Sequence, residues 1–67
     1  MMPKQTSRYK IGDIWRWSRP DHSESESLLL ISKGYAPDIF DVLILENGER
    51  VDNVRMGLGY FTWEKIA

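Results

Sequence analysis

The segment from Asp41 to Val54 constrains the fold most, because two β-prone runs flank the dipeptide Asn47-Gly48. Asn-Gly readily adopts the positive φ angles of a type I′ turn, and a two-residue turn fixes the register of the strands that it joins. We therefore expect a central hairpin in which Ile44 pairs with Val51. This register places four apolar side chains on one face, which we predict to be the core face: Phe40, Val42, Ile44 and Val51.

Short alternating or apolar runs elsewhere predict further strands, and no window has the sustained 3.6-residue apolar period of a long helix. We expect five strand regions: Tyr9–Trp17, Leu28–Ser32, Ile39–Leu45, Glu49–Val54 and Tyr60–Ile66. A polar loop, Ser18–Ser27, separates the first two regions. The chain is thus predicted to be all-β, with residues 1–8 as a flexible N-terminal tail and residues 9–67 as one small β-barrel domain.

Composition limits how such a small domain is stabilised and what it binds. The 67 residues include no cysteine, so we expect no disulfide and a reducing, cytoplasmic location. Three tryptophans, three tyrosines and two phenylalanines are suited to an apolar core without crosslinks. The net charge of −1 argues against broad capture of nucleic acid, and no apolar run is long enough to span a membrane.

Three segments resemble parts of small SH3-like barrels. The run Tyr9-Lys-Ile-Gly-Asp-Ile-Trp-Arg-Trp17, with a glycine-aspartate bend before alternating apolar residues, is similar to their opening strand. Val42–Val51 resembles their middle hairpin, and Trp63–Ile66 resembles their closing strand. The resemblance implies a five-stranded antiparallel SH3-like barrel. Small proteins of this appearance are common in bacteriophage genomes, so it also implies a phage source and the host cytoplasm as location.

The opening segment is also similar to the start of MazF/PemK-type toxin endoribonucleases, through Gly12-Asp13-Ile14-Trp15 and the loop at Pro20. In that family a loop arginine and a later serine or threonine carry out RNA cleavage. Arg19 occupies the position of the loop arginine. The chain departs from the family because it is shorter and has no serine or threonine between Lys33 and Tyr60. A MazF-like endoribonuclease is therefore a remote alternative.

No set of residues in the sequence predicts catalysis, a cofactor or a metal site. Asp21, His22, Glu24 and Glu26 offer metal-ligating atoms, but a serine-rich loop does not force them to converge. We interpret them as a solvated loop. The only histidine has no partner serine or cysteine for a nucleophilic dyad. We therefore expect a protein that is not an enzyme.

The aromatic residues suggest a binding surface beyond the core. We expect Trp15, Phe40 and one of Phe61 or Trp63 to be buried. The partner-binding surface is predicted to combine aromatic anchors with one arginine, at a groove between the long loop and the last connector: Trp17, Arg19, Tyr35 and Tyr60. The function that we favour is a non-catalytic interaction module, phage-encoded, that docks on a protein partner.

Two further partner classes remain open. In the alternative function, a nucleic-acid-binding small barrel, Arg16, Arg19 and Arg55 hold phosphates while Trp17 or Tyr60 stacks on a base. The second open class is a further copy of this chain. Leu43 and Leu45 lie on the hairpin face opposite the predicted core, where a second copy or a stable partner would cover them.

Overall fold

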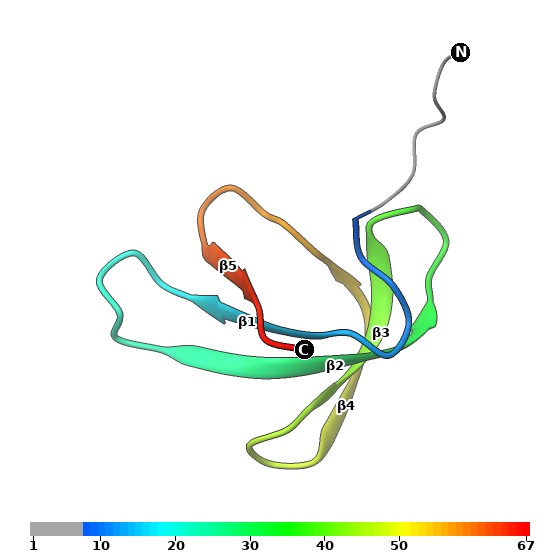
Figure 1. The fold of residues 1–67 in the computed structure, drawn as a ribbon, viewed down its shortest axis with the longest axis horizontal. Coiled ribbons are helices and arrows are strands. Elements are labelled where there is room, and N and C mark those ends of the chain that lie inside the picture. The colour runs from blue at the N-terminus through cyan, green and yellow to red at the C-terminus, as the bar shows by residue number, and fades with distance from the viewer. Residues whose placement is uncertain (1–7) are drawn as a thin grey trace.

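The computed structural model describes residues 8–67, which form one antiparallel sheet of five strands (Figure 1). The strands are β1 (Ile14–Ser18), β2 (Ser25–Lys33), β3 (Ile39–Ile44), β4 (Glu49–Arg55) and β5 (Thr62–Lys65). Their order across the sheet is β4-β3-β2-β1-β5. The described chain has no helix that is long and apolar enough to cross a membrane. The five antiparallel strands of this one sheet confirm the predicted all-β, antiparallel fold.

The sheet is open, with β4 and β5 as its two edges. Within residues 8–67, β4 pairs with β3 and β5 pairs with β1, and no pairing joins β4 to β5. The closed barrel stays a prediction. The tail predicted for residues 1–8 lies outside the described residues except for Arg8, whose guanidinium carbon is 5.8 Å from the ring centre of Tyr9.

The predicted type I′ turn is wrong. A type I′ turn needs positive φ at both central residues, but only Gly48 has one, at 74°. The connection is a four-residue loop, residues 45–48, in which the N–H of Gly48 donates to the carbonyl of Ile44 at 2.7 Å. Val51 consequently pairs with Val42 and not with Ile44. The register differs by two residues from the expected one, so Val51 still lies on the same face as Ile44.

Two β-bulges bend the sheet. One interrupts the β2–β3 pairing between Leu30 and Ser32. The other lies in β4, where Phe40 pairs with Val54 and Val42 pairs with Val51. In this bulge two residues of β4, Asp52 and Asn53, lie opposite the single residue Asp41 of β3. Asn53 adopts a φ of 56° and donates its backbone N–H to Asp41 Oδ1 at 3.0 Å. Bulges increase local twist, and here they curve the sheet around its inner face, the face that carries Trp15 and Leu28.

The core lies on this inner face. Its buried side chains come from β1, β2, β3 and the connector after β4: Trp15, Leu28, Leu30, Phe40, Val42, Ile44 and Met56. Burial of Trp15 and Phe40 is as predicted, whereas the expected burial of Phe61 or Trp63 is wrong, because both are only half-buried. Val51, expected in the core, is 37% exposed because β4 is an edge strand with no neighbour beyond it. Met56, in the connector after β4, is also buried.

β2 begins three residues earlier than the sequence indicated. Ser25, Glu26 and Ser27 were assigned to the polar loop, but they pair with Ser18, Trp17 and Arg16 of β1. These polar residues alternate, so Glu26 lies beside Trp17 while Ser27 lies beside Arg16 on the outer face, the face opposite the core. The nine residues of β2 span about 30 Å, and this length separates the loops at its two ends.

Candidate functional site: an apolar groove with an aromatic wall

An apolar groove of about 190 Å³ lies on the inner face, beside the open side of the sheet. Leu28, Val42 and Ile44 form its floor. Its two walls come from the edge of β4 and from the last part of the chain, with these lining residues: Val51, Val54, Arg55, Leu58, Phe61 and Trp63. A cavity of about 150 Å³ holds a benzene ring. The groove therefore has room for one large apolar side chain of a ligand.

Phe61 is the centre of an aromatic cluster that forms one wall of the groove. Its ring centre is 4.9 Å from that of Trp17, 5.0 Å from that of Tyr60 and 6.5 Å from that of Trp63. The last two pairs are edge-to-face, a favourable arrangement of aromatic quadrupoles. Trp63 also donates its Nε1–H to the carbonyl of Leu58 at 3.0 Å. These contacts fix the positions of the four rings relative to one another.

Arg19 belongs to the same cluster. Its guanidinium carbon is 6.0 Å from the ring centre of Phe61, and its Nε donates to Glu24 Oε1 at 2.7 Å. The hydrogen bond and the negative charge of Glu24 raise the pKa of Arg19, with a smaller contribution from Tyr60. Arg19 is thus a permanent cation, held at the rim of the aromatic wall by a surface ion pair.

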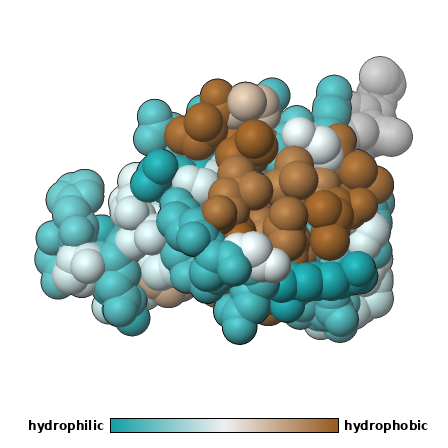
Figure 2. Space-filling view, turned by 90° about the horizontal axis from the view of Figure 1, so that it is seen from below, coloured by the Kyte–Doolittle hydropathy of each residue, from teal (hydrophilic) through white to brown (hydrophobic). Residues whose placement is uncertain are grey.

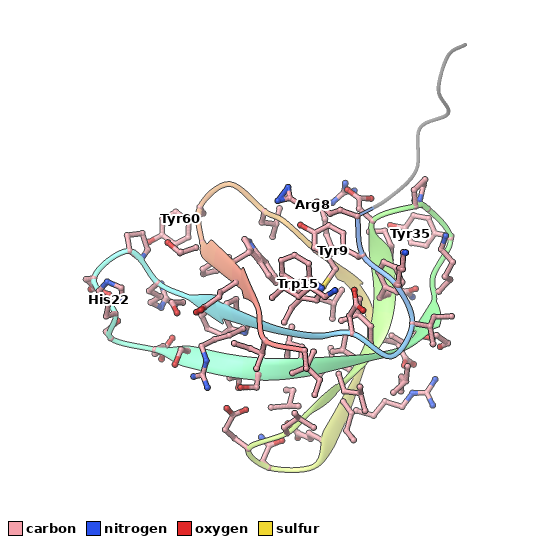
Figure 3. The ribbon with its side chains drawn as sticks, viewed as in Figure 1. Arg8, Tyr9, Trp15, His22, Tyr35 and Tyr60 are labelled. Carbon is pink, nitrogen blue, oxygen red and sulfur yellow. The ribbon has the colours of Figure 1, made fainter. Side chains whose placement is uncertain are left out.

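Tyr35 is the one predicted partner-binding residue that lies elsewhere. It is 79% exposed in the loop between β2 and β3, and Figure 3 shows it on the other side of the molecule from Tyr60. Trp17, Arg19 and Tyr60 all lie around Phe61. The length of β2 explains the separation. The structure therefore brings together three of the four predicted residues, and Tyr35 is not part of the groove.

The three arginines of the nucleic-acid alternative do not share a surface. Arg16 lies on the outer face, opposite Glu64 and Ser27. Arg55 lines the groove on the inner face and contacts Asp38 through Nη1 at 3.5 Å. With Arg19 paired to Glu24, two of the three cations already have a carboxylate neighbour. This arrangement does not form the continuous basic track that binds a nucleic-acid backbone.

A polar hollow adjoins the aromatic wall on the other side of Trp17. Ser23, Glu24, Ser25 and Glu26 line it together with the indole. Trp17 Nε1 donates to Glu26 Oε1 at 3.2 Å, which turns the Glu26 carboxylate toward both the hollow and the groove. Residues 17–26 carry three carboxylates and one arginine. This end of the groove is therefore acidic.

The acidic loop residues do not form a cluster suited to a metal ion. In the part of the chain that the structure describes, no three histidine, aspartate or glutamate side chains converge in that way. The Ser23 hydroxyl and the Ser23 backbone N–H, which donates to Asp21 Oδ1 at 3.0 Å, hold the pKa of Asp21 below its ordinary value. His22 adopts a φ of 60° at the tip of the loop. These residues shape a tight turn.

Three residues of the site were not singled out from the sequence. Phe61 and Trp63 were considered only as core residues, and Glu26 was assigned to a solvated loop. The early start of β2 brings Glu26 beside Trp17, and the aromatic spacing Tyr60-Phe61-x-Trp63 was the available signal for the wall. None of the protein-family models, curated protein sequences or solved structures with which the chain was compared matches it.

Proposed function

We propose that this protein is a non-catalytic interaction module that binds a protein partner through the groove. The observation that carries the proposal is the aromatic wall around Phe61 beside an open apolar groove. Aromatic anchors supply large contact area at small entropic cost and dominate many binding surfaces. Trp17, Arg19 and Tyr60 form the contact surface in this proposal.

The partner segment in this proposal carries a large apolar side chain next to a lysine or arginine. The groove accepts the apolar side chain, because its lining is almost entirely apolar. The hollow beside Trp17 accepts the basic side chain, since Glu24 and Glu26 lie there. A carboxylate pair also repels phosphate, so the same charge pattern favours a protein segment over nucleic acid.

The strand order supports a small SH3-like architecture as part of the same proposal. Strands β1 to β4 follow one another in the sheet in chain order, and the last strand, β5, returns to pair with β1, which gives the order β4-β3-β2-β1-β5. Strong bending at two bulges brings the edges β4 and β5 to opposite sides of one groove. A phage source and a location in the host cytoplasm, which the resemblance implies, belong to this proposal as well.

Selection from a library of random twelve-residue peptides tests the function. We expect the protein to enrich peptides that carry an aromatic or large aliphatic residue next to lysine or arginine. Tyr60→Ala and Val51→Lys should each weaken the selected peptides at least tenfold, because they remove an anchor or place a charge in the groove. Both residues are exposed, so folding should persist.

Tyr35→Ala is the matched control, since Tyr35 is also an exposed tyrosine but lies at the other end of β2. Equal binding by the wild type and by both groove variants would contradict the proposal. Selected peptides that lack basic residues would contradict the role of Glu24 and Glu26.

Two further measurements address the alternative functions. Binding of a single-stranded oligonucleotide that weakens steeply with salt would favour the nucleic-acid alternative. Cleavage of single-stranded RNA that disappears in Arg19→Ala would favour the toxin-like alternative. We expect neither result, because Arg19 is occupied by Glu24 and the other two arginines point to different surfaces.

A further inference from the structure

The loop that joins β3 to β4 carries the only Asn-Gly pair of the chain, Asn47-Gly48. Both residues are exposed, and Gly48 has a φ of 74°. The hairpin end projects from the sheet at the bottom of Figure 1 and faces the reader in Figure 2. Water therefore reaches the Asn47 side chain, and Gly48 has no side chain that would shield its own backbone nitrogen.

Asn47 folds its side chain back over the backbone of the next residue. Its Oδ1 accepts the backbone N–H of Glu49 at 2.8 Å, which closes an Asx turn around Gly48. This turn directs Cγ of Asn47 toward the backbone nitrogen of Gly48. The same hydrogen bond stabilises the negative charge that develops on Oδ1 when a nucleophile adds to Cγ. The loop thus presents an activated amide next to a backbone nitrogen.

We propose that Asn47 is a site of spontaneous deamidation. The backbone nitrogen of Gly48 forms a bond to Cγ of Asn47, the bond from Cγ to Nδ2 breaks, and ammonia leaves with the proton that the Gly48 nitrogen has lost. Water then opens the resulting cyclic imide at either of its two carbonyls. One opening gives aspartate, and the other gives isoaspartate, in which the main chain runs through Cγ. Water is the only co-reactant that these steps consume.

A backbone hydrogen bond opposes this reaction and sets its rate. The N–H of Gly48 donates to the carbonyl of Ile44 at 2.7 Å, and this bond holds the proton that the attacking nitrogen must lose. The nitrogen can attack only when the loop opens locally, a motion that costs less in exposed loops than in the core. Glu46 limits this opening, because its carboxylate accepts the backbone N–H of Ser27 in β2 at 2.9 Å.

Conversion changes the hairpin end in two ways. A carboxylate at position 47 lies between those of Glu46 and Glu49 in the sequence, and like charges at this spacing repel. Isoaspartate also adds one carbon to the main chain, which lengthens the loop that the bond from Gly48 to Ile44 closes. Ile44 is the last residue of β3 and lines the groove, so the altered loop adjoins the groove.

Peptide mapping after prolonged incubation of the whole protein at mildly alkaline pH tests the proposal. Trypsin cleaves after lysine and arginine, so Asn47 and Asn53 fall in separate peptides, residues 34–50 and 51–55. We expect peptide 34–50 to gain about 1 Da, the difference between an amide and a carboxyl group, and to accept methyl groups from an isoaspartyl-specific methyltransferase. Peptide 51–55 should stay unchanged, because the β-branched Val54 crowds the nitrogen that would attack.

The unfolded chain in urea is the positive control for the chemistry. If peptide 34–50 converts in urea but stays unchanged in the folded protein, the fold protects Asn47 and the proposal is overturned. Equal conversion of both peptides in the folded protein would overturn it as well, because the loop would then have no special role. Neither result depends on what the groove binds.

Two variants test the control by loop opening. Glu46→Ala should speed the conversion of Asn47 by roughly fivefold, the change in an opening equilibrium that the loss of one hydrogen bond produces. Glu46→Gln is the matched control, since its amide oxygen still accepts the Ser27 N–H while the charge is removed, and it should convert at the wild-type rate. Equal rates for the wild type and Glu46→Ala, or equal acceleration in both variants, would overturn the role of the contact between Glu46 and Ser27.

Discussion

Both carboxylate oxygens of Glu46 lie within hydrogen-bond distance of the backbone N–H of Ser27, at 2.9 and 3.1 Å. Glu46 is in the β3–β4 loop and Ser27 is in β2, so the contact ties the loop to the neighbouring strand. The backbone N–H of Leu45 also donates to the carbonyl of Ser27 at 2.9 Å. These bonds continue the β2–β3 pairing past the end of β3 and stabilise the four-residue loop.

Replacing Glu46 should therefore destabilise the protein. In Glu46→Ala the N–H of Ser27, a buried residue, loses its partner, and an unsatisfied buried donor is costly. We expect the midpoint of thermal unfolding to fall by about 5 °C. Glu49→Ala is the control, because within residues 8–67 the Glu49 side chain bonds only to the neighbouring Asn47. Similar midpoints for both variants would contradict a structural role for the Glu46–Ser27 contact.

This contact explains why the hairpin register was not predictable. The Asn-Gly preference is local, and it predicts a two-residue turn when considered alone. Contacts with a strand outside the hairpin favour the longer loop, and Asn47 Oδ1 instead accepts the N–H of Glu49 at 2.8 Å. Strand existence and the inner face were predictable, because period-two alternation survives a two-residue change of register.

Stability should fall in mild acid. Asp41 accepts hydrogen bonds from the Ser32 hydroxyl at 2.6 Å and from the backbone N–H of Asn53, and both hold its pKa below the ordinary value. The backbone N–H of Ser27 does the same for the pKa of Glu46. A carboxylate with a lowered folded-state pKa stabilises the fold above its unfolded-state pKa. That stabilisation is lost as the pH falls through the folded-state pKa.

Chemical denaturation at a series of pH values checks this expectation. The free energy of unfolding should be constant near neutral pH and should decrease between about pH 5 and pH 3. Asp41→Asn should flatten this decrease. Asp52→Asn should leave it unchanged, because among the described residues the Asp52 carboxylate pairs only with the exposed Arg50. A curve for Asp41→Asn that parallels the wild type would contradict the assignment.

Gly57 should not tolerate a side chain. Its φ is 78°, and an added Cβ would lie 2.6 Å from the Tyr9 hydroxyl oxygen. Alanine in this conformation costs about 1–2 kcal/mol, and displacement of Tyr9 from Trp15 and Phe40 adds to it. Since a domain of this size has roughly 3–10 kcal/mol in total, Gly57→Ala should unfold at much lower urea concentration.

Gly59 provides the control for this substitution. An alanine Cβ there meets no atom within 4 Å, and its φ is outside the left-handed region. Gly59→Ala should be neutral or slightly stabilising, by up to about 1 kcal/mol, through the unfolded state. If both substitutions had the same effect, the packing of Tyr9 on Gly57 would not be important for stability.

The candidate site was predictable in part. Trp17 and Arg19 are close in sequence and lead into the same loop, so their proximity followed from the chain. Tyr60 joined them because β5 pairs with β1, which places residues 62–65 beside residues 15–18. Tyr35 was misplaced because the expected second strand was too short. The start of β2 at Ser25 could not be predicted, because its first residues are polar. Pairing with β1 makes them part of the strand.

Asn53 should accept glycine better than any other residue. Its φ of 56° lies in the left-handed region, where asparagine and glycine are favoured. Its backbone N–H, which every residue except proline retains, donates to Asp41 Oδ1. Asn53→Gly should therefore change the free energy of unfolding by only a few tenths of a kcal/mol, whereas Asn53→Ala should lower it by about 1–2 kcal/mol. Urea denaturation measures both, with Asp52→Ala as the exposed neighbour control. Equal losses for the alanine and glycine variants would show that the side-chain amide, and not the backbone conformation, is what the bulge requires.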